Sequence, residues 1–425
     1  MRVVLTSHGS TGDIYPMIAF GHALRQAGHE VKFATAPLYR QAILNAGLDY
    51  VHLPPDWEKE IFIEFMRELN RAPLPLLQLR WIYKGAVPFM GELIDAMNEL
   101  LGWADVLVSS YFFPHYRALA AKHEIPFVTF AFCHNLVPTT DYPPEGTPPL
   151  HNFPKRLQRR WNGMLWRLAN KLVDVTINSV AGELFTQKGL GQSNGFLTRP
   201  ADLCLVAVSR KLMGGIEHDP SFQFCGYLRW QSPENPEMGK EIEAFCQGQR
   251  VPVMTFGSVA FDDTHTIMSR FLKNWPKGKP IIIQSGWAGL SVELERPEIK
   301  VVPAMSHDQL FRYASLVIHH GGAGTTASVL HAGVPHIIIP HIADQQWWGT
   351  EIVKLKAGLS LSKRKWPVKL PGYVKRVERN AAMREQAKVI ADTLADENGG
   401  RLSVHILEEY VRSRAVLPSK GKKGS

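Results

Sequence analysis

Cysteine is scarce in this sequence, and its spacing shows no sign of a metal site. The 425 residues include four cysteines, Cys133, Cys204, Cys225 and Cys246, with no CxxC pair among them. Disulfide frameworks are typical of small secreted chains, whereas a chain of this size builds its core without them. We therefore expect four buried free thiols in a reducing compartment.

Long apolar runs are also missing. No stretch approaches the roughly 18 to 20 apolar residues that span a bilayer. The opening MRVVLTSHGS turns polar before the apolar part of a signal peptide could form. We expect a cytoplasmic protein whose contact with a membrane is at most peripheral, at the inner face.

Positive charge is in excess, because 48 Lys and Arg stand against 39 Asp and Glu, for a formal net charge of +9. Part of this excess lies in the ending SKGKKGS, and we expect residues 416–425 to form a basic, disordered tail. Nucleic acid would need a recognisable binding module, which the sequence lacks, so we expect no nucleic-acid partner.

Short apolar segments alternate with helical patterns in the first half of the chain. The expected strands cover residues 2–7, 30–35, 105–110 and 126–131. This alternation predicts a doubly wound parallel sheet in an N-terminal Rossmann-like domain, residues 1–208. Two helical insertions, 56–102 and 152–188, are longer than a crossover needs and could shape a binding pocket.

The chain is too long for one ordinary core, and a second domain is expected after a break. A stretch rich in Gly, Pro, Ser and Asn predicts a linker at residues 209–236. A second Rossmann-like domain over 237–397 and a last helix over 398–415, which could cross back to the first domain, complete the prediction. The expected α/β architecture is two doubly wound domains that face each other across a cleft. The strand segments of the second domain are 252–258, 279–285, 300–303, 316–320 and 336–340.

The most specific motif is VIHHGGAGTTASVLHAGVP, residues 317–335. A strand ends at its two histidines, a glycine-rich turn follows, and a helix starts near Thr325 or Thr326. Glycines let backbone N–H groups approach an anion closely, and the helix N-terminus adds a partial positive charge. The pattern predicts a diphosphate site that needs no metal; an ordinary strand–turn–helix is the alternative.

Two more polar segments follow neighbouring strands. Ser258 ends the segment TFGS, and Asp344 and Gln345 are adjacent in HIADQQWWG. A carboxylate beside an amide suits sugar hydroxyls, because the first accepts hydrogen bonds and the second both donates and accepts. A polar turn before a helix is the simpler alternative. These segments fall at the carboxyl ends of consecutive strands, where open α/β sheets bind ligands.

These residues carry a resemblance to a known family. The run from SGW (285–287) through VVP and HDQLF to HHGGAGTT and ADQQWW resembles family 1 of the UDP-glycosyltransferases. It is most similar to the branch with sterol glucosyltransferases and glycopeptide-antibiotic glycosyltransferases. The similarity covers residues 255–361, with a further match at the first strand and GSTGD. It implies a GT-B fold, an inverting mechanism and no required metal.

Carried over by position, the resemblance implies a donor site in the second domain. Asp344 and Gln345 would bind the donor sugar. The tryptophan that stacks on uracil in plant members falls here near Val301, which leaves the nucleotide preference open. The residues implied beside the nucleobase are Val301, Val302 and Pro303, and those implied for the diphosphate are Ser258, His319, Gly321, Gly322, Ala323, Gly324, Thr325 and Thr326.

The motif HGSTGD places Asp13 after a glycine-bounded turn at the end of the first strand. A carboxylate there could accept the proton of an acceptor hydroxyl as its oxygen attacks the anomeric carbon of the sugar. In the resembling branch this aspartate is the general base; a helix cap is the structural alternative. Many relatives read GxRGD, whereas Thr11 replaces the arginine here, so a cationic contact from this loop is missing.

Three histidines could extend the site. His8 is an alternative base, and His115 and His134 follow strand ends where they could line an acceptor pocket. For each of them a packed, structural histidine is the simpler interpretation. The chain has no DxD motif, by which metal-dependent glycosyltransferases hold a cation, and we expect neither a metal nor a cofactor.

The sequence thus predicts an inverting, metal-independent glycosyltransferase. It would move a hexose, glucose from UDP-glucose, onto a hydroxyl of a lipophilic acceptor such as a sterol, terpenoid or lipid alcohol. A nucleotide-sugar epimerase of the same fold and a non-catalytic lipid- or sugar-binding protein are the alternatives. We expect a monomer that binds a nucleotide sugar and an acceptor.

The segment 154–175 mixes apolar and basic residues at helical spacing. A basic amphipathic helix with tryptophans can lie in the headgroup region of an anionic bilayer, which predicts a peripheral membrane contact. A helix that packs its apolar face on the core is the alternative. The apolar residues are Leu157, Trp161, Leu165, Leu168 and Leu172, and the basic ones are Lys155, Arg156, Arg159, Arg160, Arg167 and Lys171.

Overall fold

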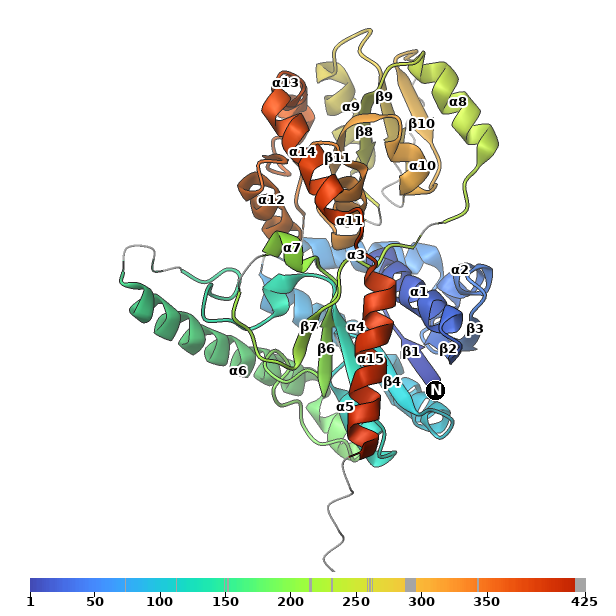
Figure 1. Cartoon of the computed structure of the whole chain (residues 1–425), viewed down its shortest axis with the longest axis vertical. Helices are drawn as coiled ribbons and strands as arrows, with labels where there is room; N and C mark the ends of the chain where they lie inside the picture. Colours follow the sequence, from blue (N-terminus) through green and yellow to red (C-terminus); the bar gives the residue numbers. More distant parts are fainter. Residues whose placement is uncertain are drawn as a thin grey trace, which may run out of the picture.

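The chain folds around two parallel β-sheets, one in each half of the sequence. The computed structural model describes residues 1–72, 74–111, 113–148, 150, 153–213, 216–230, 232–257, 259, 261, 263–286, 296–341 and 344–416. In Figure 1 the second sheet and its helices lie above the first, and the C-terminal helix runs down beside the first. Ser258 and the predicted tail from residue 417 onward fall outside the described residues.

The first sheet has seven strands in the order β3-β2-β1-β4-β5-β6-β7, and all of its neighbours pair in parallel. Central strands are buried on both faces, which explains why they read as continuous apolar runs. The strands are β1 (Arg2–Thr6), β2 (Glu30–Thr35), β3 (Asp49–His52), β4 (Val106–Ser110), β5 (Phe127–Ala131), β6 (Leu203–Val206) and β7 (Phe222–Phe224). The helices are α1 (Thr11–Gln26), α2 (Arg40–Asn45), α3 (Lys59–Arg71), α4 (Pro75–Leu101), α5 (His115–Lys122), α6 (Lys155–Gln187) and α7 (Arg210–Met213), with short 3₁₀ turns at Pro37–Tyr39 and His134–Leu136.

The second sheet has six parallel strands in the order β10-β9-β8-β11-β12-β13. Together the two sheets give the α/β architecture that the sequence predicts. The strands are β8 (Val251–Thr255), β9 (Ile281–Gln284), β10 (Ile299–Val302), β11 (Ala314–His319), β12 (His336–Ile338) and β13 (Gly358–Ser360). The helices are α8 (Pro236–Cys246), α9 (Thr264–Asn274), α10 (His307–Phe311), α11 (Ala323–Ala332), α12 (Gln345–Lys354), α13 (Trp366–Glu378), α14 (Ala381–Leu394) and α15 (Gly399–Val416).

The sequence predicts a linker at residues 209–236, but only the last part of this stretch connects the domains. It holds α7 and then β7, which extends the first sheet through the pairing of Phe222 with Cys204. The side chain of Phe222 is fully buried in the core of the first sheet. The connection between the domains is therefore confined to the residues between β7 and α8.

The C-terminal helix α15 returns to the first domain and packs on α1 (Figure 1). Leu407 is fully buried in the same hydrophobic cluster as Val3 of β1. Nε2 of His29 lies 3.0 Å from Oε1 of Glu408, which ties the helix to the end of α1. The chain thus crosses between the domains a second time, which limits how they can move apart.

The small number of cysteines and the lack of long apolar runs each led to an expectation about the structure. All four cysteines are buried and free, as the sequence predicts. No helix in the described part of the chain combines the length and the apolar character needed to cross a bilayer.

Candidate active site

The two domains enclose a cavity of about 500 Å³. In the first sheet the strand order reverses between β1 and β4, and in the second between β8 and β11. Open α/β sheets bind ligands at such reversals, outside the carboxyl ends of the strands. The loops after β1 and β11 hold HGSTGD and HHGGAGTT, and residues of both line the cavity. The two strongest sequence motifs are therefore brought to one site.

Asp13 lies in the first turn of α1 and lines the cavity. Its Oδ2 accepts hydrogen bonds from the backbone N–H of Ser10 at 2.9 Å and from the Ser10 hydroxyl at 3.2 Å. Ser10 is the N-cap and in turn accepts the N–H of Gly12, so both residues form a capping box. Among the described residues none donates to Oδ1 of Asp13. The carboxylate is thus fixed in place with one oxygen available.

Burial raises the pKa of Asp13 to about 6, an effect that the hydrogen bonds from Ser10 oppose. A base with a pKa near the working pH combines a large ionised fraction with a useful affinity for the proton. The turn before it requires glycine: Gly9 has φ +124°, and a Cβ there would lie 2.5 Å from Oδ2 of Asp13. The close approach of backbone and carboxylate depends on that missing side chain.

His8 also lines the cavity, but its ring is held by protein groups. Its Nε2 lies 3.0 Å from the hydroxyl of Tyr116 and 3.3 Å from Oγ1 of Thr6. Burial lowers the pKa of His8 to about 4, so the imidazole is neutral at pH 7. These contacts favour the structural interpretation of His8.

The glycine-rich turn becomes the N-terminus of α11. Gly322 is the N-cap and offers no side-chain acceptor, and no described residue accepts the N–H groups of Ala323, Gly324 and Thr325. Gly322 and these three residues line the cavity. Unpaired N–H groups and the partial positive charge of a helix end make a site for an anion. Thr326 does not line the cavity, and its hydroxyl donates to the carbonyl of Gly322 at 2.9 Å.

The structure corrects the prediction for His319. This side chain is fully buried and does not line the cavity. Its Nδ1 accepts the N–H of Gly321 at 3.2 Å, and its Nε2 lies 3.0 Å from Nδ1 of His336. His319 and Gly321 therefore bond to each other behind the turn and do not reach a ligand. Their role is to hold the turn in shape.

His320, one residue further on, takes the place predicted for His319. It lines the cavity, and its Nδ1 has no hydrogen-bond partner in the described part of the chain. A Cβ on Gly322 would lie 2.4 Å from Nε2 of His320, and one on Gly257 would lie 3.1 Å from its Cε1. The ring is thus packed between two glycines. Burial lowers the pKa of His320 to about 3, which makes it a neutral donor or acceptor at pH 7.

Asp344 and Gln345 lie at the start of α12, and both line the cavity. Oε1 of Gln345 accepts the backbone N–H of His341 at 2.8 Å, which orients the amide. Burial, followed by the charges of Asp13 and Glu145, raises the pKa of Asp344 to about 7. The charge of Asp13 therefore acts on Asp344 from the other domain.

The segment predicted to lie beside the nucleobase does not line the cavity, and the residues that follow it in the chain do. Val301, Val302 and Pro303 do not line the cavity, because Val301 and Val302 belong to β10 and pair with β9. The five residues that follow, 304–308, line it. Among them Asp308 forms an ion pair with Arg229, which comes from the connection between the domains and also lines the cavity. Sequence reasoning did not identify this pair.

One wall of the cavity is strongly apolar and comes from the first helical insertion. On α3 the lining residues recur at intervals of three and four positions, which is one face of a helix. On α4 the lining residues are also mostly aromatic or apolar, whereas Trp81 of the same helix is 43% exposed and does not line the cavity. The lining residues of the two helices are Phe62, Phe65, Met66, Leu69, Ile82, Tyr83, Gly85, Ala86, Phe89, Met90 and Leu93.

His115 and His134 do not line this cavity. His115 is buried against Tyr116 and Phe185, and neither of its ring nitrogens has a hydrogen-bond partner among the described residues. His134 packs edge-on against Trp347, with 3.8 Å between ring centroids, beside a smaller cavity. Neither histidine therefore takes the acceptor-pocket position that the sequence allows, and both are packed side chains, which is the simpler interpretation given above.

Both domains contain a segment that matches a known family of domains. The glycosyltransferase family 28 N-terminal domain matches residues 3–88, and the erythromycin biosynthesis protein CIII-like C-terminal domain matches residues 291–408. The chain is 26% identical over 383 residues to the vancomycin aglycone glucosyltransferase of Amycolatopsis orientalis, covering 85% of this chain and 86% of that protein. It is 24% identical over 382 residues to the sterol 3-beta-glucosyltransferase UGT80A2 of Arabidopsis thaliana, covering 83% and 56%.

Solved structures share the fold. The calicheamicin glycosyltransferase CalG4 aligns with a TM-score of 0.67 and 19% identity over 98% of this chain and 99% of that one. The spinosyn rhamnosyltransferase SpnG, complexed with thymidine diphosphate, aligns with a TM-score of 0.68 and 16% identity over 96% and 100%. The chain is therefore a glycosyltransferase with the GT-B fold, and it contains a match to the family 28 N-terminal domain and one to the erythromycin biosynthesis protein CIII-like C-terminal domain.

Proposed function

We propose that this enzyme transfers a hexose, with inversion and without a metal, from a nucleotide diphosphate sugar to a hydroxyl of a lipophilic acceptor. UDP-glucose is the donor that the family resemblance favours. The observation that carries the proposal is the division of the cavity. A polar half is formed by the loops of the second sheet, an apolar half is walled by α3 and α4, and Asp13 also lines it.

The reaction follows from this arrangement. The available Oδ1 of Asp13 accepts the proton of the acceptor hydroxyl as that oxygen forms a bond to the anomeric carbon. The bond from this carbon to the diphosphate breaks at the same time, and attack from the face opposite the leaving group inverts the configuration. The N–H groups at the start of α11 stabilise the charge that develops on the diphosphate, which is the role that a cation has in metal-dependent transferases.

The apolar wall supports a transferase over a nucleotide-sugar epimerase. An epimerase needs no second substrate, whereas here two helices of an insertion place their apolar faces into the cavity. Two relatives have names that specify a glycopeptide aglycone and a sterol as acceptors. A hydrophobic surface of this kind suits a ring system or an alkyl chain better than a small polar acceptor.

The function is tested by incubating the purified enzyme with UDP-glucose or TDP-glucose and a mixed lipid extract, followed by mass spectrometry. We expect lipid products heavier by one hexose, formed without added divalent metal and in the presence of EDTA. Release of free glucose alone, an isomerised nucleotide sugar, or a strict need for a divalent metal would contradict the proposal.

The reaction should lose rate at acidic pH. Because the base acts in its ionised form and burial raises the pKa of Asp13 to about 6, protonation removes it as the pH falls. Asp344, whose pKa burial raises to about 7, also becomes protonated in this range and adds to the loss of rate. We expect kcat/KM to fall about tenfold per pH unit below about pH 6. A flat profile down to pH 5, with the enzyme still folded, would contradict Asp13 as the base.

Gly85 should control the width of the acceptor half. A Cβ at this position of α4 would lie 2.5 Å from Cε2 of Phe65 on α3, and both residues line the cavity. Overpacking of this kind costs about 1–3 kcal/mol of stability unless the neighbour shifts. If the Phe65 ring shifts into the cavity, the acceptor loses space, so we expect Gly85→Ala to lower kcat/KM for the acceptor roughly tenfold while donor affinity stays unchanged. Gly91→Ala is the matched control on the same helix, because its nearest neighbours lie at 3.7 and 3.8 Å. Equal effects of both substitutions would contradict a specific role for Gly85.

A further inference from the structure

Helix α6 is the longest helix of the described chain, with 33 residues, and its N-terminal part projects from the side of the first domain (Figure 1). One face packs inward against α4 and the sheet. The buried apolar residues of this face include Leu165, Trp166, Val173, Ile177, Ala181 and Phe185. The helix is therefore anchored along its length without using its opposite face.

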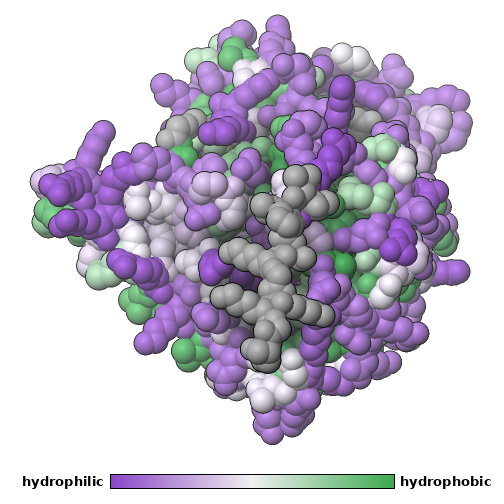
Figure 2. Space-filling view, turned by 60° about the horizontal axis from the view of Figure 1, so that its bottom comes forward, coloured by the Kyte–Doolittle hydropathy of each residue, from purple (hydrophilic) through white to green (hydrophobic). Residues whose placement is uncertain are grey.

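The opposite face carries an apolar stripe that points to solvent. Its residues are separated by three, four or seven positions, so they line up along one side of the helix. Their exposed fractions are 44–56%, which is far above that of any core residue. In Figure 2 hydrophobic side chains follow the edge of the molecule that α6 forms, beside hydrophilic ones. The stripe consists of Leu157, Met164, Leu168, Leu172 and Val175.

This geometry changes the interpretation of the sequence pattern. Of the apolar residues expected on one membrane-facing side, Leu165 instead packs in the core. Trp161 is half-buried, and its Nε1 donates to the carbonyl of Pro148 at 3.1 Å. Leu157, Leu168 and Leu172 remain exposed. Packing on the core thus explains one side of α6 and leaves the stripe unexplained.

A basic row borders the stripe. Arg156, Arg160, Arg167 and Lys171 are separated by four or seven positions, and all four are exposed. No carboxylate of the described residues forms an ion pair with any of them. On a helix each of these positions lies directly beside the stripe, so cationic groups flank apolar ones along about four turns. Such an arrangement matches the boundary between anionic headgroups and acyl chains.

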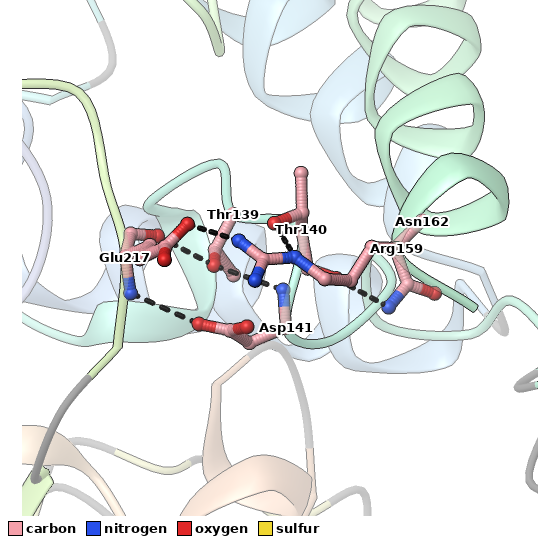
Figure 3. Close-up of polar contacts among 6 residues, drawn as sticks. All are labelled: Thr139, Thr140, Asp141, Arg159, Asn162 and Glu217. Carbon is pink, nitrogen blue, oxygen red and sulfur yellow. Dashed lines mark hydrogen bonds and ion pairs between the residues drawn. The ribbon is translucent and has the colours of Figure 1, made fainter. Parts of the chain in front are cut away.

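Arg159 differs from its basic neighbours, because it is part of the anchor. Its Nε donates to Oγ1 of Thr140 at 3.0 Å, and its guanidinium forms an ion pair with Glu217 (Figure 3). Asn162, one turn further along, donates to the carbonyl of Thr140 at 2.9 Å. The backbone N–H of Glu217 in turn donates to Asp141 at 2.9 Å. This network fixes the projecting end of α6 to the domain and removes Arg159 from the free basic row.

We propose that α6 docks on an anionic lipid surface, with its apolar stripe in the headgroup region and its basic row against the lipid phosphates. A second copy of the chain would fit the stripe less well, because pairing two such helices would bring the unpaired cationic rows together. An anionic lipid surface can take up the apolar stripe and bind the basic row at the same time. The proposal does not depend on the donor, the acceptor or the chemistry of the cavity.

Vesicle flotation with the full-length enzyme tests this directly. Vesicles are made of phosphatidylcholine alone or of phosphatidylcholine with 30 mol% phosphatidylglycerol, which is about the anionic content that attracts basic segments. Two triple variants remove each feature, Leu168→Gln/Leu172→Gln/Val175→Gln for the stripe and Arg160→Glu/Arg167→Glu/Lys171→Glu for the basic row. The matched control, Lys369→Glu/Lys375→Glu/Arg376→Glu, makes the same change in net charge on exposed residues of α13.

We expect the wild type and the α13 control to float with anionic vesicles, and each α6 variant to lose at least about tenfold in partitioning. Melting temperature checks that all variants are folded, since the replaced side chains are already exposed. Equal loss in the α13 control would assign binding to net charge and overturn the proposal. Flotation that is unaffected by both α6 variants, no binding by the wild type, or a dimer in light scattering that the stripe variant dissolves would also overturn it.

Discussion

Replacing Asp13 by asparagine should lower turnover by about 10²- to 10⁴-fold, the contribution that a positioned general base usually makes. An alcohol is a poor nucleophile at neutral pH and must lose its proton as the new bond forms. Asparagine retains the size of the side chain and an oxygen that can accept the N–H of Ser10. The capping box should therefore survive, at a cost to stability of less than about 1 kcal/mol. Binding of UDP and the melting temperature should change little.

The measurement is steady-state turnover with saturating donor, with UDP calorimetry and thermal melting on the same preparation. Ser10→Ala is the matched control, because it removes the N-cap hydroxyl that bonds to Asp13 and leaves the carboxylate present. It should lower stability by about 1 kcal/mol and turnover only modestly. Turnover of Asp13→Asn within a few-fold of the wild type would reduce Asp13 to a helix cap. A large loss of melting temperature would instead indicate a structural role.

The predicted residues that line the cavity lie mostly where a strand ends in a glycine turn. β1 and β11 are apolar runs, and HGSTGD and HHGGAGTT follow them with glycines, which can adopt the positive φ that such turns require. The reversal of strand order then brings both turns to the same cavity. Asp13 and Gly324 lie in its lining for this reason, and Asp344 lines it from the N-terminus of α12.

Errors of one to three residues arose at the carboxyl ends of strands. β11 has no alternation of apolar and polar residues, so nothing in the sequence distinguishes His319, whose side chain turns into the core, from His320, which faces the cavity. The same reasoning chose Val301, Val302 and Pro303 at the end of β10, whereas the residues that line the cavity are those of the following segment, 304–308. β7 has three residues, too few for any periodicity to appear among the polar residues around it.

Contacts between segments that are far apart in the chain could not be predicted from the sequence. Arg229 and Asp308 are 79 positions apart and meet only because the domain connection passes α10. The apolar face of α3 was recoverable, since Phe62, Phe65 and Leu69 repeat at helical spacing, but the same pattern is typical of a helix packed on a core. Which side of an amphipathic helix faces a cavity is decided by tertiary packing.

Replacing Gly324 by valine should abolish most donor binding and leave the fold intact. Gly324 lies in the first turn of α11 and lines the cavity, and a Cβ at this position would meet no protein atom within 4 Å. The new Cβ therefore meets no side chain or distant backbone of the protein. Valine has at least the helix propensity of glycine, so the melting temperature should stay the same or rise slightly. The new methyl groups would occupy the space in front of the helix N-terminus, where we place the diphosphate.

We expect the affinity for UDP to fall at least about tenfold, which corresponds to about 1.4 kcal/mol, and kcat/KM for the nucleotide sugar to fall at least as far. Gly372→Val is the matched control: it lies in α13, away from the cavity, and its Cβ would also meet no protein atom within 4 Å. Gly322→Ala gives the opposite contrast, because its Cβ would lie 2.4 Å from Nε2 of His320 and should lower the melting temperature. If Gly324→Val binds UDP as tightly as the wild type, the diphosphate does not lie at the N-terminus of α11, and the polar half of the cavity must hold the donor in another orientation.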